Sequence, residues 1–589
     1  MKLQELTTYE LIQKHHLKDL QSEGYILKHK KSGAKVVLLS NDDENKVFSI
    51  GFRTPPKDST GLPHILEHSV LCGSKRFPSK DPFVELVKGS LNTFLNAMTY
   101  PDKTVYPIAS CNDKDFQNLM HVYMDAVFYP NIYEHDEIFR QEGWSYKLDS
   151  ADAKLEYNGV VYNEMKGAFS SPEGVLDRVV LNSLFPDTSY RNESGGDPEV
   201  IPELTYEQFL DFHRKYYHPS NSYIYLYGDM DMAEKLEWLD KEYLSHFDAM
   251  EIDSKIQKQE AFAERKEVEI AYSVSSNESE EDNTYLSYNK VIGTSLDRNL
   301  YLAFEILDYA LLSAPGAPLK KALVDAGIGK DIMGSYDNGI YQPVLSIVAK
   351  NANQEQKEEF ISVIEDTLKS IVENGMDKKA IEAGINYHEF RYREADFGNF
   401  PKGLMYGLQI FDSWLYDDEK PFIHLDAIET FKFLKEQVNT NYFEQLIQKY
   451  LLDNTHASIV VVKAEKGRTA RLEKELDEKL QAYKASLSKE EVNRLVERTA
   501  QLITYQEEPS TEEELKTIPV LEREDISREI APIYNEEKYY DDTLMVYHNI
   551  ETNGIGYVDL LFDLSAVPAE LLPYVGILQS VLGIIDTKN

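Results

Sequence analysis

His64, Glu67 and His68 are the residues whose types and spacing point most directly to chemistry. They lie in the segment Gly61-Leu-Pro-His-Ile-Leu-Glu-His-Ser-Val70. Residues four apart share one face of a helix, so two imidazoles at this spacing can bind one metal ion together. Glu67 lies one turn beyond His64, where its carboxylate can take a proton from water at the same metal. The motif therefore predicts a catalytic zinc site.

The residues around the motif favour the helix that this metal geometry requires. Pro63 suits a first helical turn, Thr60 or Gly61 can cap the helix, and Gly73 can end it. The order H-x-x-E-H reverses the more common H-E-x-x-H and is the signature of the inverted zincins, which are zinc peptidases. The motif alone leaves open an alternative, namely two ordinary histidines on an amphipathic helix.

A third ligand must come from elsewhere, because a catalytic zinc has three protein ligands and one open position. Spacing does not select it among 101 acidic residues. Three segments resemble the presequence protease branch of the pitrilysin-type metallopeptidases: 61–74, Lys88-Gly-Ser-Leu-Asn-Thr-Phe-Leu-Asn-Ala-Met-Thr-Tyr-Pro-Asp-Lys-Thr104, and Asn158-Gly-Val-Val-Tyr-Asn-Glu-Met-Lys-Gly167. The resemblance implies that Glu164 is the third ligand. The alternative for Glu164 is a solvated carboxylate on a helix, the usual fate of a glutamate.

The second of these segments implies a substrate-binding strand edge at Asn96 and Ala97. An edge strand can bind an extended peptide through its backbone, with little demand on the peptide's sequence. The alternative is that Asn96 is a loop asparagine that satisfies its own turn near Pro101-Asp102.

Together these residues predict a zinc-dependent endopeptidase or oligopeptidase with one Zn²⁺ per chain. His64, His68 and Glu164 are the expected ligands, and Glu67 is the expected general base on zinc-bound water. The resemblance implies that the substrates are short, unstructured peptides. Two alternatives remain open: a non-catalytic peptide-binding or assembly subunit, and a metal-regulated structural protein. The intact Glu67 argues against the first, because a retired site need not keep its base.

The composition is strongly acidic, with 101 Asp and Glu against 62 Lys and Arg and a net charge of −39. A polyanion would need a large basic patch, and no Lys/Arg run supplies one, so we expect no nucleic-acid partner. Acidic walls around a cleft would attract basic peptides. A generally acidic surface that aids solubility is an equal alternative, because charge totals do not reveal placement.

The sequence predicts a cytoplasmic protein without a membrane segment. It has no run of about 18 apolar residues. Its first residues show neither a secretory signal nor an organellar presequence. Two cysteines, Cys72 and Cys111, are too few for a disulfide framework.

The chain reads as an α+β protein of repeated units, each a mixed or antiparallel sheet with helices packed on it. Residues 1–252 form the expected metal-bearing domain, 253–284 a polar linker, and 285–465 a second domain without metal ligands. The strand-like runs at 223–228 and 458–463 end the two domains in a similar way. The resemblance implies a duplication of which one copy holds metal.

The rest of the chain is charged and then apolar. Residues 466–529 have Glu and Lys interleaved at helical spacing, which predicts a helical hairpin that packs by one face; an inert spacer is the alternative. Residues 530–589 read as an incomplete third domain with strands at 544–548 and 555–563. The resemblance implies a C-terminal half with further substrate-holding residues, so we expect this chain alone to bind zinc but to cleave peptides slowly or not at all.

Overall fold

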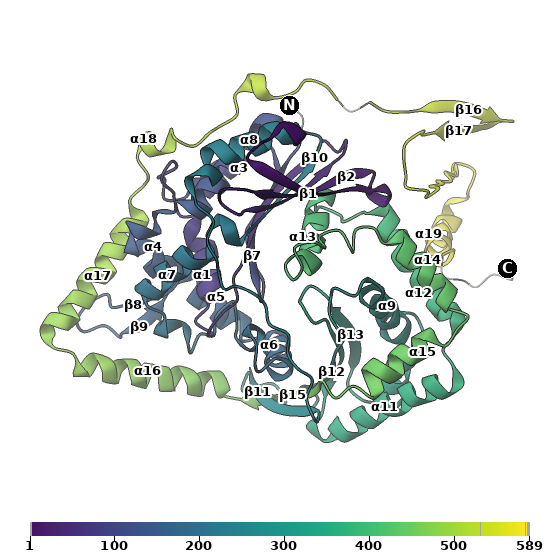
Figure 1. Ribbon diagram of the computed structural model, residues 1–589. Coiled ribbons are helices and arrows are strands. Elements are labelled where there is room, and N and C mark those ends of the chain that lie inside the picture. The colour runs from purple at the N-terminus through teal and green to yellow at the C-terminus, as the bar shows by residue number, and fades with distance from the viewer. Residues whose placement is uncertain (1–2, 531, 584, 586–589) are drawn as a thin grey trace. The chain divides into compact units, whose positions relative to one another are not determined.

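The computed structural model describes residues 3–530, 532–583 and 585, and the chain divides into two compact units. Unit 1 is Met1–Ala531 and unit 2 is Pro532–Asn589. Unit 1 holds two α+β domains and a pair of long charged helices (Figure 1). The mixed α+β class and the repeated units predicted from the sequence are confirmed.

The first domain is built on an eight-stranded sheet with the order β1-β2-β3-β10-β4-β7-β5, in which β6 also pairs with β7. Only β10 and β3 run parallel; the other neighbours are antiparallel. The central strands β4, β7 and β10 are apolar or aromatic over most of their length and are buried on both faces, so helices must cover both sides of the sheet. The strands are β1 (Tyr9–Leu17), β2 (Ser22–His29), β3 (Lys35–Ser40), β4 (Lys46–Arg53), β5 (Asn92–Leu95), β6 (Met98–Thr99), β7 (Lys103–Ser110) and β10 (Ser222–Gly228).

Several helices of the first domain begin where short polar side chains cap them. The side chain of Asn112 accepts from the backbone N–H of Asp115, and Ser171 accepts from Gly174 in the same way. Helices at 113–128 and 172–184 follow from these caps and from their apolar spacing. The domain contains α1 (Leu62–Val70), α2 (Pro82–Gly89), α3 (Asp113–Phe128), α4 (Asp136–Glu142), α5 (Val160–Ala168), α6 (Pro172–Leu184), α7 (Tyr206–Tyr216) and α8 (Met232–Glu242), with the short pair β8 (Ser145–Lys147) and β9 (Glu156–Asn158).

The second domain repeats the topology of the first. Its five-stranded sheet has the order β11-β15-β12-β14-β13, with β11 and β15 parallel and the other pairs antiparallel. This matches β3-β10-β4-β7-β5 strand for strand, including the position of the parallel pair. The strands are β11 (Lys266–Val274), β12 (Thr284–Val291), β13 (Asp331–Asp337), β14 (Val344–Ala352) and β15 (Ala457–Lys466).

The helices of the second domain follow its strands in the order seen in the first. α9 follows β12 as α1 follows β4, and α11 and α12 follow β14 as α3 and α4 follow β7. The helices are α9 (Arg298–Asp308), α10 (Pro318–Asp325), α11 (Lys357–Asn374), α12 (Lys378–Glu394), α13 (Lys402–Trp414), α14 (Ile428–Gln437) and α15 (Tyr442–Leu446). The duplication implied by the resemblance is therefore visible in the topology.

The segment 253–284 is not simply the linker that its polarity predicts, because it contains β11. This strand lies at the edge of the second sheet, where charged side chains are tolerated on the solvent side. Glu267 of β11 pairs with Lys357 at 2.9 Å. The polar composition of this segment therefore predicted a linker where the structure has an edge strand.

Helix α13 joins the two domains by packing on the sheet of the first, between that sheet and the second domain (Figure 1). Gly403 and Gly407 permit this contact: an added Cβ would lie 2.1 Å from the ring of Tyr227 and 2.6 Å from that of Tyr225. The hydroxyl of Tyr225 donates to the carbonyl of Gly403 at 2.9 Å. The second domain thus supplies the helix that buries one face of the first sheet.

The charged region contains two helices, α16 (Arg468–Ser486) and α17 (Lys489–Glu507), followed by the short α18 (Glu512–Leu515). They meet at Leu487-Ser488 and diverge from this turn instead of lying side by side (Figure 1). Each packs by one apolar face on the β8–β9 region, so the two helices are more than a spacer without packing contacts. The leucine and valine residues of this cluster are Leu148, Leu155, Leu476, Leu480, Val492, Leu495 and Val496.

Unit 2 contains the hairpin β16 (Glu536–Tyr540) and β17 (Thr543–Tyr547) and the helix α19 (Leu572–Val581). The predicted strand at 544–548 is present, but 555–563 forms no strand. A strand needs a neighbour for its backbone groups, and the described part of unit 2 offers none beyond the hairpin. None of its described residues is buried. Across the described residues of both units, no helix has the length and apolar character needed to span a membrane.

Candidate metal centre

His64, His68 and Glu164 lie together in the first domain. The Nε2 atoms of His64 and His68 are each 3.8 Å from Glu164 Oε2, and one ligand atom from each residue lies within 4.8 Å of the others. Ligand atoms around a tetrahedral zinc are about 3.3–3.5 Å apart. The donor set, two imidazoles and one carboxylate, therefore fits zinc after a shift of a few tenths of an ångström. It is the one group of three potential ligands found among the described residues.

Helix α1 places the two histidines on successive turns, with their rings edge to face and centroids 4.9 Å apart. It begins at Gly61, whose φ of 70° lies in the left-handed region that favours glycine. An added Cβ at Gly61 would meet the carbonyl oxygen of Gly195 at 2.7 Å. Thr60 does not cap the helix, since its hydroxyl donates to Asp58 at 2.6 Å. The start of α1 thus lies directly against the 195–196 loop.

Helix α5 brings Glu164 to the same place. Val161 and Met165 are buried behind it, while 54% of the Glu164 side chain is exposed toward the site. Val160, at the start of the helix, is exposed. Gly159, just before the helix, lets α5 approach the end of α4, because a Cβ there would be 2.1 Å from the carbonyl oxygen of Gly143.

Both histidines are oriented through their other ring nitrogen. His64 Nδ1 lies 3.1 Å from the carbonyl oxygen of Gly195, and His68 Nδ1 lies 3.2 Å from Glu142 Oε2. Each acceptor requires the hydrogen on Nδ1, which leaves Nε2 of both rings free to bind metal. Neither Glu142 nor Gly195 was identified from the sequence, since each is far along the chain and belongs to no short motif.

The hydrogen bonds and charges around His68 and Glu142 oppose the effect of burial on the pKa values of both side chains. Burial alone would lower the pKa of His68, but the hydrogen bond and charge of Glu142, with Glu67 and Glu164, raise it above the ordinary value. Burial alone would raise the pKa of Glu142, but the hydrogen bonds from His68 and Gln141 lower it. The contact therefore favours the protonated form of His68 and the ionised form of Glu142.

Glu67 is 9% exposed and lines a cavity of about 420 Å³ beside His68. Asn96 and Ala97 line the same cavity, so the structure brings all six residues selected from the sequence into one region. The two residues lie between β5 and β6, which pair with β7 at the edge of the sheet. The carbonyl of Asn96 accepts from the hydroxyl of Tyr123 at 3.2 Å.

The end of α17 forms the far side of this cavity. Lys80 Nζ donates to the carbonyls of Tyr505 and Glu508 at 2.6 and 2.7 Å. Its ammonium lies 4.5 Å from the centroid of the Tyr505 ring. The charged helices thus complete the wall of the site, a position that no pattern in their sequence predicts.

Three family descriptions match the chain in succession. Residues 47–170, which carry the metal centre, match "Insulinase (Peptidase family M16)". Residues 203–387 match "Peptidase M16 inactive domain", and residues 462–589 match the region described as associated with subgroup C of the M16 peptidases. The chain belongs to peptidase family M16. The predicted resemblance to its pitrilysin-type, presequence protease branch is confirmed.

Curated M16 relatives align with almost the whole chain. Protein HypA of Clostridium perfringens is 49% identical over 581 residues, 99% of this chain and 60% of that protein. Presequence protease 1, chloroplastic/mitochondrial, of Arabidopsis thaliana is 40% identical over 589 residues, 99% of this chain and 54% of that protein. The chain therefore spans somewhat more than half the length of these relatives.

Solved M16 structures share the fold. A protease from Helicobacter pylori superposes with a TM-score of 0.57 at 14% identity, covering 78% of this chain and 100% of that one. Pitrilysin superposes with a TM-score of 0.54 at 18% identity, covering 78% of this chain and 47% of its own. At such low identity the comparison concerns the fold alone.

Proposed function

We propose that this chain is the metal-binding part of a zinc-dependent peptidase that hydrolyses short, unstructured peptides. The observation that carries the proposal is the meeting of His64, His68 and Glu164. His68 also lines a cavity together with Glu67, Asn96 and Ala97. Membership of family M16 and the names of the relatives support a peptidase role.

Different residues of the chain have separate roles in the proposed hydrolysis. Zinc, when bound to His64, His68 and Glu164, polarises a carbonyl and lowers the pKa of water to about 7. Glu67, one turn from His64, takes the proton of the attacking water and passes it to the leaving amine. The Nδ1 contacts of the histidines hold both imidazoles in the orientation this requires.

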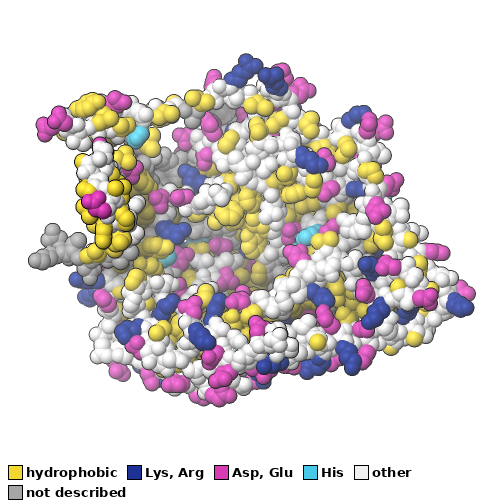
Figure 2. Space-filling model, turned by 180° about the vertical axis from the view of Figure 1, so that it is seen from behind, with side chains coloured by type: hydrophobic (Ala, Val, Ile, Leu, Met, Phe, Trp, Pro, Cys, Tyr) yellow, Lys and Arg dark blue, Asp and Glu magenta, His cyan; other side chains and the backbone are white. Residues whose placement is uncertain are grey.

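The sheet edge at β5 and β6 is the proposed peptide-binding surface, with Asn96 and Ala97 beside the metal centre. An extended peptide would add to this edge through its backbone. Acidic and basic side chains are mixed over the face shown in Figure 2, without a large basic patch. The absence of a nucleic-acid partner, a preference for basic peptides and a cytoplasmic location all stay predictions.

We further propose that a C-terminal half, equivalent to the remaining part of the relatives, covers unit 2 and completes the enzyme. Unit 2 exposes most of its large apolar side chains: Leu561 is 98% and Val558 80% exposed. Apolar surface of this extent is typical of an interface. The chain alone is then expected to bind zinc and to cleave peptides slowly or not at all.

A fluorogenic, unstructured basic peptide tests this function, with the chain alone and with a C-terminal half supplied. We expect zinc-dependent cleavage that rises on complementation and disappears in Glu67→Gln. Peptide binding without any cleavage under both conditions would instead support the non-catalytic subunit. The intact Glu67 and the assembled ligand set disfavour that alternative.

A further inference from the structure

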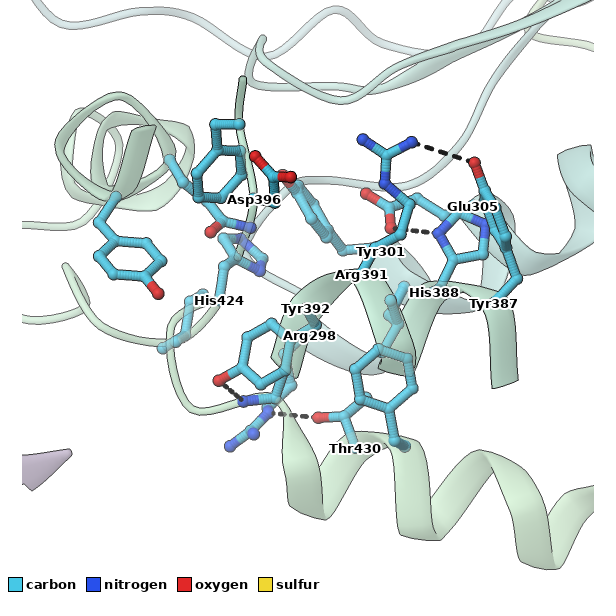
Figure 3. A pocket seen from close by; sticks show the side chains of 17 residues that line it. Arg298, Tyr301, Glu305, Tyr387, His388, Arg391, Tyr392, Asp396, His424 and Thr430 are labelled. Carbon is cyan, nitrogen blue, oxygen red and sulfur yellow. Dashed lines mark hydrogen bonds and ion pairs between the residues drawn. The ribbon is translucent and has the colours of Figure 1, made fainter. Parts of the chain in front are cut away.

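The second domain contains a cavity of about 290 Å³ at the position that corresponds to the metal centre (Figure 3). At the metal centre α1 carries the two histidines and α4 carries Glu142, which orients His68. The second cavity lies against the counterparts of these two helices, α9 and α12. In the first domain His68 of α1 faces Glu142 of α4 at 3.2 Å. In the second, Glu305 of α9 faces His388 of α12 at 3.6 Å, so carboxylate and imidazole have exchanged helices.

This second cavity does not suit a metal ion. Glu305 and His388 supply two donor groups, and no third joins them closely enough among the described residues. Its walls are instead largely aromatic, with a few charged groups between the rings (Figure 3). The aromatic residues that line it are Tyr301, Tyr387, Tyr392, Phe397, Tyr406 and Phe431.

Three charged groups of the cavity, Arg298, Arg391 and Asp396, are not paired with one another. The guanidinium of Arg391 donates to the hydroxyl of Tyr387 at 3.1 Å, and that of Arg298 donates to the Thr430 hydroxyl at 2.9 Å and to the Asp426 carbonyl. Over the described residues, neither guanidinium has a carboxylate within 4.0 Å, and Asp396 has no cation within that distance. The cavity therefore presents positive and negative groups that its own side chains leave unmatched.

His388 adds an uncharged polar atom. Its Nε2 is buried without a hydrogen-bond partner, although nearly all buried polar atoms have one. Burial and the nearby Arg391 lower the pKa of His388 to about 4, so the ring is neutral at physiological pH. A ligand would thus meet the charges of the arginines and of Asp396, and in part that of Glu305, because burial raises the pKa of Glu305 to about 7.

A molecule that carries both a carboxylate and an ammonium group matches this arrangement. A cavity of 290 Å³ lies at the lower end of small-molecule sites, which excludes an oligopeptide. We propose that the cavity binds a free α-amino acid with an aromatic or large apolar side chain. Its carboxylate pairs with Arg391, its ammonium group with Asp396, and its side chain packs between the aromatic walls. The cavity shares no residue with the metal centre, so the proposal does not depend on peptidase activity.

Isothermal titration of the full chain with L-phenylalanine tests the proposal. We expect saturable binding with a Kd of about 1 mM or tighter. N-acetyl-L-phenylalanine lacks the ammonium group and L-phenylalaninamide lacks the carboxylate, so each is expected to bind at least about tenfold more weakly. Arg391→Gln should weaken binding of L-phenylalanine to a similar degree, but it should not further weaken binding of L-phenylalaninamide, which has no carboxylate. Asp396→Asn should likewise weaken binding of L-phenylalanine without further weakening binding of N-acetyl-L-phenylalanine, which has no ammonium group.

Both variants change exposed side chains and are expected to fold, which a thermal unfolding curve verifies. Arg494→Gln, an exposed arginine on α17, is the matched control and should bind L-phenylalanine as the parent does. The proposal is overturned if neither L-phenylalanine nor L-leucine gives saturable binding up to about 20 mM. It is equally overturned if both derivatives bind to the parent chain as tightly as L-phenylalanine does. It is also overturned if Arg391→Gln and Asp396→Asn bind L-phenylalanine as tightly as the parent chain does.

Discussion

His68 Nδ1 lies 3.2 Å from a carboxylate oxygen of Glu142, a residue 74 positions later in the chain. This contact turns His68 Nε2 toward Glu164, 3.8 Å away. The imidazole is therefore held in the orientation of a metal ligand by a residue that is not itself a ligand.

Replacing Glu142 by glutamine should weaken zinc binding about 10–100-fold, the usual effect of losing such an orienting partner. The amide keeps the size of the side chain but removes the charge that fixes the His68 tautomer. Competition with a chromogenic chelator measures the change. Glu134→Gln, an exposed substitution just before α4, is the control and should leave the zinc Kd unaltered. Equal zinc affinity in both variants would contradict the orienting role.

Glu67→Gln should separate metal binding from catalysis. Because Glu67 is not among the three proposed ligands, the zinc Kd is expected to stay within about twofold of the parent value. Peptide turnover by the complemented enzyme should fall by about 10²–10⁴-fold, the contribution of a general base. Mass spectrometry of the cleavage products measures turnover. Turnover at the parent rate would exclude Glu67 as the base.

Zinc affinity should decrease as the pH falls below about 7, because the metal needs neutral imidazoles. The folded pKa of His68 is raised above 6.5, so its stabilisation of the metal-free protein is full below 6.5 and is lost as the pH rises through the folded value. The folded pKa of Glu142 is lowered below 4.5, so its contribution is present above 4.5 and is lost as the pH falls through the folded value. The contact between protonated His68 and ionised Glu142 thus competes with zinc most strongly between pH 4.5 and pH 6.5.

The measurement for this pH dependence is the zinc Kd at pH 7.5 and pH 5.5. We expect it to rise at least about tenfold at the lower pH. In Glu142→Gln the rise should begin at a lower pH, since His68 loses the partner that raises its pKa. A Kd that does not change over this interval would refute the ligand role of the histidines.

Lys103→Met should destabilise the chain strongly. Lys103 and Asp102 are 3% and 0% exposed, with Nζ and Oδ1 3.4 Å apart, and Asp102 also accepts hydrogen bonds from the hydroxyls of Tyr190 and Tyr416. Removing the ammonium group leaves the buried carboxylate without its cation, a loss of about 3–5 kcal/mol in the free energy of unfolding. Urea denaturation measures it. Lys88→Met, which removes a surface pair with Glu85, should cost less than about 1 kcal/mol.

Local signals in the sequence were enough for the parts of the fold that local interactions determine. Helices α3 (113–128) and α6 (172–184) have side-chain caps and apolar residues at helical spacing, both of which are visible in the sequence. The H-x-x-E-H motif is local too, and its helix formed as expected. Glu164 required the family resemblance, since no spacing rule connects it to His68.

The sequence did not reveal features that depend on distant partners. β11 is polar because it lies at a sheet edge, and it is a strand only because β15 pairs with it almost 200 residues away. Residues 555–563 are rich in strand-forming residues but find no neighbour to pair with, so propensity alone does not make them a strand. Glu142 and Gly195 were missed for the same reason, since long-range packing of α4 and of the 195–196 loop brings them to the histidines.

Zinc content, measured by mass spectrometry of metals in the purified parent chain and in Glu164→Gln and Glu67→Gln, tests the central claim most directly. The proposed site predicts one zinc per chain in the parent and in Glu67→Gln, and a clear loss of zinc in Glu164→Gln. The Glu164 side chain is half exposed, so its substitution is expected to leave the fold intact. A parent chain that binds no zinc, or a Glu164→Gln chain that retains it fully, would contradict the assignment of His64, His68 and Glu164 as its ligands.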